Sequence, residues 1–166
     1  MCPTTQAPKT DVQGATIAET AVEVERGNWV GAMAGGIIAG ALMAVPMAVL
    51  AEPMLTEAIP ALYGLEGGFA GVFLHLSHAA VFGVVFAAIV QLDRFASYGE
   101  TVRRSTLAGL AYGLAIWLVA GAFVMPVWLN AVGITASIPT FDTTSLVAHA
   151  VFGVALGALY PYVAKY

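Results

Sequence analysis

Four long apolar stretches constrain this chain more than any other feature of its sequence. They run over about residues 28–50, 68–91, 105–129 and 144–163. None of them contains Asp, Glu, Lys or Arg. A helix of about 20 residues crosses the hydrocarbon core of a bilayer, and each stretch reaches that length. The alternation of apolar and polar residues that a transmembrane β-barrel requires is missing, so helices are the remaining solution in lipid.

The sequence therefore predicts an all-α fold, an integral membrane four-helix bundle over residues 28–163. A polar, acidic leader over residues 1–27 precedes it, and we interpret this leader as a short amphipathic helix or a disordered tail. Composition supports the lipid environment, since only 10% of residues are charged against about 25% in soluble chains.

Charge and motifs exclude several classes of function. The chain has no basic patch that could follow a phosphate backbone, so nucleic-acid binding is not expected. It also has no Walker loop, nucleophile elbow, HExxH or CxxC pattern. We therefore predict no catalytic residues and no independent enzyme activity.

The basic residues predict the orientation in the membrane. All of them fall on one side if the chain starts inside: Lys9, Arg26, Arg94, Arg103, Arg104 and Lys165. The loops over about 51–67 and 130–143 contain none. Because Lys and Arg accumulate on the cytoplasmic side, we expect a multi-pass protein of the plasma membrane with both termini in the cytoplasm.

The second half of the chain repeats a pattern of the first half. A histidine, two small residues and an aromatic follow one another at spacings of four, four and three, as His75, Ala79, Gly83 and Phe86 and again as His149, Gly153, Gly157 and Tyr160. Further matches are Pro46 with Pro126 and Ile59-Pro60 with Ile138-Pro139. The pattern predicts a bundle built from a duplicated helical hairpin.

The small residues of this pattern predict how the helices pack. Residues four apart share one helix face, and small side chains there let two helices approach closely in lipid. The residues that we expect at these contacts are Gly36, Gly40, Ala79, Gly83, Gly109, Gly113, Gly153 and Gly157.

A resemblance to a known family rests on the same residues. The stripe His149-xxx-Gly153-xxx-Gly157-xx-Tyr160, its copy at His75 and the duplicated four-helix layout resemble small prokaryotic membrane proteins of the YagU-like kind. The acidic loops are similar to those of haloarchaeal members. The resemblance implies a fold and a membrane location, and it implies almost no chemistry.

All three histidines, His75, His78 and His149, lie within the predicted helices. His75 and His149 should lie at one depth, so one hypothesis makes them axial ligands of heme b. A second hypothesis adds His78 and gives three nitrogens for zinc or copper. A third hypothesis is proton or quinone chemistry, since ionisable residues inside a membrane are functional candidates. The alternative is structural, because a neutral histidine can hydrogen-bond to a backbone carbonyl or a serine of a neighbouring helix.

Three functions follow as hypotheses. The first is an accessory or structural subunit of a larger membrane complex, such as a respiratory one, with other membrane subunits or a second copy as partners within the lipid bilayer. The second is a small cytochrome b-like or metal-binding redox protein. The third is a pore for a small neutral solute, which has the least support because no polar stripe runs along the bundle.

Overall fold

The computed structural model describes the backbone of residues 12–163 and the side chains of residues 29–163. The described elements are α1 (Val12–Leu50), η1 (Met54–Ala58), α2 (Ile59–Ala61), α3 (Gly68–Val90), α4 (Ala96–Gly99), α5 (Val102–Ile116), η2 (Trp117–Val124), α6 (Met125–Ala131) and α7 (Thr143–Val163). The two η elements are π-helices, and residues 12–163 contain no strand.

Four helical segments are long and apolar enough to cross a membrane. They are Trp29–Leu50, Gly68–Val90, Val102–Ala131 and Thr143–Val163. The predicted all-α membrane bundle is therefore confirmed. The third span is longer than the predicted 105–129, because α5, η2 and α6 continue one another without a break.

The first helix differs from the expectation for the leader. Helix α1 begins at Val12, so residues 12–27 of the predicted leader form one continuous helix with the first span. No proline interrupts the chain between Val12 and that span. Residues 1–11 lie outside the described part of the chain.

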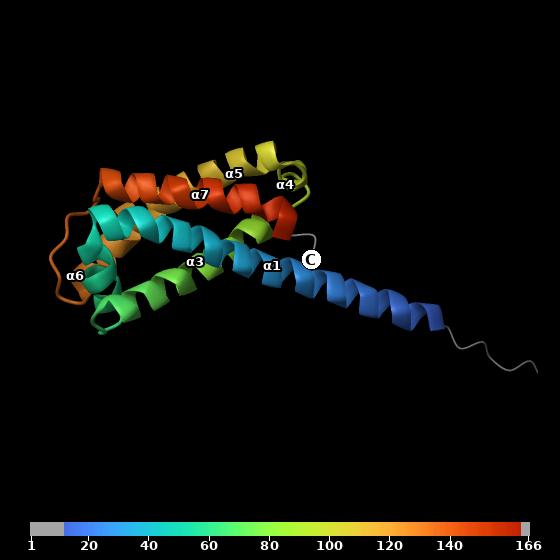
Figure 1. The fold of residues 1–166 in the computed structure, drawn as a ribbon, viewed down its shortest axis with the longest axis horizontal. Coiled ribbons are helices and arrows are strands. Elements are labelled where there is room, and N and C mark those ends of the chain that lie inside the picture. Colours follow the sequence, from blue (N-terminus) through green and yellow to red (C-terminus); the bar gives the residue numbers. More distant parts are fainter. Residues whose placement is uncertain (1–11, 164–166) are drawn as a thin grey trace, which may run out of the picture.

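The four spans form two antiparallel hairpins, α1 with α3 and α5–η2–α6 with α7 (Figure 1). Helix α1 also packs along α7 and joins the hairpins. The connections at residues 51–67 and 132–142 lie at one end, together with α6, and we call this the α6 end. Residues 91–101, which include α4, lie at the opposite end, the α4 end.

Glycines bring the backbones of each hairpin into direct contact. A Cβ atom added at Gly36 would lie 2.3 Å from the carbonyl oxygen of Ala79, and one at Gly83 would lie 2.4 Å from that of Ala32. The second hairpin repeats this arrangement: a Cβ at Gly109 would lie 2.2 Å from the oxygen of Gly153. Such distances exclude any side chain, so these positions serve close helix packing.

The remaining predicted packing residues lie in the same two seams. A Cβ at Gly40 would lie 2.4 Å from Cβ of Ala79, whereas one at Gly113 would lie 2.4 Å from the carbonyl oxygen of His149. A Cβ at Gly157 would lie 2.2 Å from the oxygen of Ser105. Equivalent positions of the two hairpins therefore meet in the same register.

This register corrects one of the matches proposed from the sequence. When Gly36 is superposed on Gly109 and Gly40 on Gly113, the position equivalent to Pro126 is Pro53. Pro46, which lies inside α1, has no proline counterpart. The sequence match of Pro46 with Pro126 was wrong because it relied on distance from the helix end, and the first helix ends earlier than the third.

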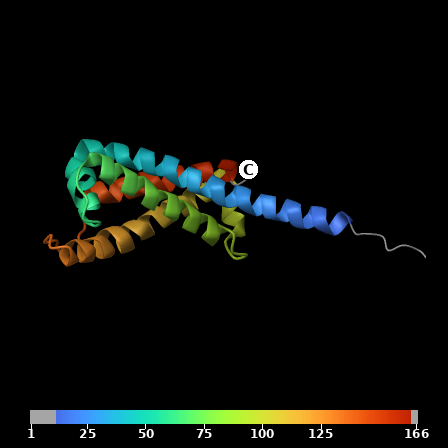
Figure 2. The same ribbon diagram turned by 90° about the horizontal axis from the view of Figure 1, so that it is seen from below.

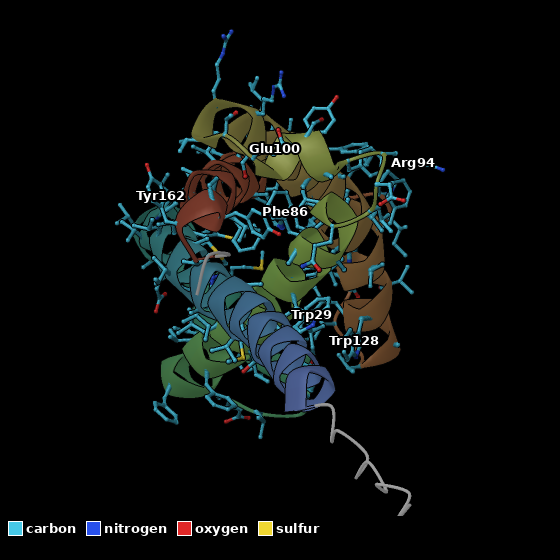
Figure 3. The ribbon with its side chains drawn as sticks, turned by 90° about the vertical axis from the view of Figure 1, so that its right-hand side faces the viewer. Trp29, Phe86, Arg94, Glu100, Trp128 and Tyr162 are labelled. Carbon is cyan, nitrogen blue, oxygen red and sulfur yellow. The ribbon has the colours of Figure 1, made fainter. Side chains whose placement is uncertain are left out.

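The α3 and α5 helices face each other without a glycine seam. One side-chain bond joins them, from the Tyr112 hydroxyl to the carbonyl oxygen of Phe82 at 2.8 Å. The rings of Phe86, Tyr112 and Tyr160 pack together beside this bond. Phe86 is 1% exposed and lies in the middle of the bundle (Figure 3). This aromatic cluster fills the bundle toward the α4 end.

Toward the α6 end, the third span diverges from the first hairpin (Figure 2). This span contains η2, the π-helix that precedes Pro126. Proline has no N–H to give to the carbonyl four residues earlier. That carbonyl, of Ala122, accepts a bond from the backbone N–H of Thr140 at 2.9 Å. The widened turn is thereby tied to the loop that follows α6.

Candidate functional site

A cavity of about 230 Å³ lies within the bundle toward the α6 end. All four spans contribute to its wall, together with η1 and the loop before α7. Its lining is mainly apolar, with Phe82, Ile116 and Phe152 on the side nearer the aromatic cluster. The divergence of the third span and the missing seam between α3 and α5 create this space.

The cavity brings together all three histidines that the sequence singled out. His75 and His78 reach it from α3 and His149 reaches it from α7. Their ring nitrogens nevertheless have different partners, and these partners determine what each histidine can do.

His75 is a contact between helices. Its Nε2 lies 2.9 Å from the carbonyl oxygen of Gly40 on α1, and its side chain is 6% exposed. A carbonyl oxygen can only accept, so this nitrogen carries the hydrogen and donates it. The structural alternative for the histidines therefore describes His75 well.

His149 turns back to its own helix. Its Nδ1 lies 2.8 Å from the carbonyl oxygen of Ser145, one turn earlier in α7. The Ser145 hydroxyl lies 3.5 Å from the same nitrogen, a much weaker contact. Among the described residues, none bonds to the other ring nitrogen, Nε2. The half-buried imidazole of His149 thus keeps one nitrogen free at the cavity.

His78 belongs to a cluster of three rings between α3 and α6, and two of these rings, His78 and Trp128, line the cavity. Its Nε2 lies 2.6 Å from the Tyr63 hydroxyl, which the loop after α2 supplies. Tyr63 also packs on Trp128 of α6, with ring centroids 5.1 Å apart. These rings lie on the side of the bundle where α3 and α6 do not pack directly on each other, and Tyr63 and Trp128 are exposed there.

The geometry does not support the two cofactor hypotheses. Each axial heme ligand presents an unprotonated nitrogen to the iron. The Nε2 of His75 is engaged by the carbonyl oxygen of Gly40, which leaves only its Nδ1 for such a role. Nor do the described residues contain a group of three or more His, Cys, Asp or Glu side chains arranged to hold a metal ion. The three-histidine metal site therefore has no support in the geometry of the described residues and stays a prediction, because the spacing of His75 and His78 on one helix does not determine where their nitrogens point.

Sequence reasoning missed the methionines of this site. Four of the six methionines in the chain line the cavity: Met43, Met47, Met54 and Met125. Met43 and Met47 lie one turn apart on α1, which is the spacing of a common face. Thioether side chains are flexible and polarisable, and they suit surfaces that adapt to an apolar ligand or contact an aromatic ring. This spacing is a signal in the sequence, but methionine at such a spacing is equally typical of ordinary helix packing.

Fold and site define a multi-pass α-helical membrane protein with a mainly apolar cavity inside its four-helix bundle. Comparison of the chain with protein-family models, with curated proteins and with solved structures finds no match. The resemblance to YagU-like proteins stays a prediction.

Proposed function

We propose that this protein binds a small, mainly apolar molecule inside the membrane, in the cavity toward the α6 end. The observation that carries the proposal is a partly open, mainly apolar cavity of about 230 Å³ in a bundle whose two hairpins are close-packed at their glycines. A structural subunit has no evident need of such a space, since an apolar cavity forfeits packing contacts and costs stability.

The size and lining of the cavity support this class of ligand. A cavity of about 150 Å³ lined by aliphatic and aromatic side chains is known to hold benzene. The present cavity is larger, so it has room for a substituted ring or a short branched chain. Its wall combines thioethers and aromatic rings with a few polar groups, which is the usual composition of a small-molecule site.

The ring cluster of Tyr63, His78 and Trp128 supports entry from the bilayer. An apolar ligand dissolves in lipid, and this side wall is formed by side chains where helices do not pack together. Side chains change rotamer far more readily than packed helices separate. We therefore propose that the ligand enters between α3 and α6.

The proposal includes the orientation predicted from charge. Arg94, Arg103 and Arg104 lie at or next to the α4 end, and Arg94 projects away from the bundle (Figure 3). We propose that this end faces the cytoplasm of a cell whose plasma membrane holds the protein, and that the cavity lies in the outer half. Labelling the single cysteine, Cys2, from each side of sealed vesicles tests this orientation. Cys2 should react only from the cytoplasmic side, whereas the introduced thiol of a Cys2→Ser, Glu66→Cys variant should react only from the opposite side.

Binding is tested with bromobenzene, whose heavy atom quenches tryptophan fluorescence. Trp128 lines the cavity, so bound bromobenzene should quench it saturably, above the linear quenching by bromobenzene dissolved in lipid. The experiment uses the full chain in lipid nanodiscs. Purely linear quenching in the wild type would contradict the proposal.

A matched pair of variants locates the binding. Ala120 lines the cavity, whereas its neighbour Val119 is exposed toward lipid. Ala120→Leu fills part of the space and should remove the saturable quenching, while Val119→Leu should leave it unchanged. A helical circular dichroism spectrum and a single elution peak show that both variants are folded.

The other functions predicted from the sequence stay predictions. An accessory role in a larger membrane complex and self-association both depend on the lipid-facing surfaces. A small-solute pore would need a path through the cluster of Phe86, Tyr112 and Tyr160, which closes the cavity toward the α4 end.

A further inference from the structure

The free nitrogen of His149 indicates which polar group the ligand carries. Nδ1 lies 2.8 Å from the Ser145 carbonyl oxygen, which can only accept, so we assign the hydrogen of the neutral ring to Nδ1. Nε2 then presents a lone pair and can only accept a hydrogen bond. A ligand group that satisfies it must be a donor, such as a hydroxyl.

Gly121 of η2 leaves room for such a group beside the imidazole. A Cβ atom added at Gly121 would lie 3.6 Å from Cε1 of His149, 3.6 Å from Oγ of Ser145 and 3.5 Å from Cδ1 of Trp117. These are ordinary van der Waals distances, so one extra atom fits there without a clash. Gly121, Ser145 and His149 all line the cavity, and we call the space between them the Gly121 niche.

The rest of the cavity favours an aromatic ring as the body of the ligand. Four methionines contribute to the wall, and thioether sulfur makes favourable contacts with ring edges. Phe82, Phe152 and Trp128 offer faces and edges to the same space, and aromatic rings pack well on one another.

We infer that the ligand is a hydroxylated aromatic molecule, of the phenol or quinol class, whose O–H lies in the Gly121 niche and donates to His149 Nε2. This inference rests on the proposed function and adds the chemical class of the ligand. His75 and His78 also line the cavity, but their Nε2 atoms are engaged by Gly40 and Tyr63, and of the three histidines it is His149 whose ring the open position at Gly121 adjoins.

Two probes of nearly equal shape test the inference. 4-Bromophenol carries the hydroxyl, and 4-bromotoluene replaces it by a methyl group of similar size. Dissociation constants come from saturable tryptophan quenching of the full chain in nanodiscs at neutral pH, each corrected for partition of the probe into lipid. A buried hydrogen bond of ordinary net strength corresponds to a roughly three- to tenfold preference for the phenol.

Variants place the hydrogen bond at His149. His149→Phe keeps a ring but removes the acceptor, so the two probes should bind equally well. Val119→Leu, the lipid-facing control outside the cavity, should retain the preference for the phenol. Gly121→Ala should weaken 4-bromophenol more than 4-bromotoluene, because the added methyl occupies the niche. The Gly121→Ala variant also serves as the test if His149→Phe does not fold. A Cβ at Gly121 meets only ordinary van der Waals contacts, so this variant should fold.

The outcomes separate the inference from the proposed function. Saturable binding of both probes with equal dissociation constants would overturn the hydroxyl and leave the apolar site in place. A phenol preference that survives both His149→Phe and Gly121→Ala would also overturn the inference. If neither probe saturates, the proposed function fails together with it.

Discussion

In the first hairpin, His75 reaches across the seam and donates to Gly40 of α1, whereas in the second hairpin His149 turns back to Ser145 of its own helix. The two histidines occupy equivalent positions in the same stripe of residues. One therefore ties two helices together, and the other keeps a nitrogen free at the cavity. Equal spacing in the sequence did not give the two histidines equal roles.

Two local differences account for this divergence. At the position after each histidine in the stripe, the first hairpin has Ala79 and the second has Gly153, so α5 and α7 approach until Gly113 meets the carbonyl of His149 itself. The second difference is η2, a π-helix whose equivalent segment in the first hairpin is ordinary α-helix. π-helical turns are frequent at functional sites, and this one sets Gly121 beside His149.

The largest expected effect comes from making the two stripes alike. Gly153→Ala gives the second stripe the small residue that the first has at Ala79, but its Cβ would lie 2.3 Å from the carbonyl oxygen of Gly109. Since backbone must move, we expect a loss of about 2–3 kcal/mol or more in the free energy of unfolding. Denaturation of the purified protein by SDS in mixed micelles measures it. Gly121→Ala, which meets no atom closer than 3.5 Å, is the control and should be nearly neutral. Equal tolerance of both substitutions would mean that the two seams are not packed as described.

The bundle is predictable because, in lipid, every backbone N–H and C=O group must be hydrogen-bonded within the protein, and few folds achieve this. Four uncharged stretches of sufficient length can only be spanning helices, and small residues four apart mark the faces that touch. Residue spacing alone therefore assigns Gly36 and Gly109 to helix contacts. Such inferences need only the geometry of a regular helix.

The cavity could not be predicted in the same way. It depends on η2 and on the course of the third span beyond it, and a π-helical turn has no clear pattern in a single sequence. The orientation of His149 depends on a hydrogen bond within its own helix, which residue spacing does not encode. The sequence predicted that the histidines lie within the spanning helices, but it could not show which nitrogen of each ring is engaged and by which partner.

A smaller effect should distinguish the two histidines by stability alone. His75→Leu removes the bond to Gly40 and should lower the free energy of unfolding by about 0.6–2 kcal/mol, the range for a polar contact between membrane helices. His149→Leu removes only a bond within α7 and should cost less than half as much. The same SDS denaturation measures both variants without added ligand. Equal losses would show that His149 also holds helices together, and would weaken its assignment to ligand binding.

The smallest effect concerns the side of the bundle that lacks a glycine seam. Tyr112→Phe removes the one side-chain hydrogen bond described between α3 and α5 but keeps the ring that packs on Phe86. Measured contacts of this kind in membrane proteins average about 0.6 kcal/mol, so we expect a loss of that order in the free energy of unfolding. Tyr98→Phe, on an exposed ring at the α4 end, is the control and should change nothing.

Because the glycine seams do not depend on Tyr112, the two hairpins should stay intact while bromobenzene gains faster access from the α4 end. A loss in the free energy of unfolding as large as that of Gly153→Ala would contradict this expectation. It would mean that the contact between α3 and α5 is as strong as the glycine seams, and that this side of the cavity is rigid.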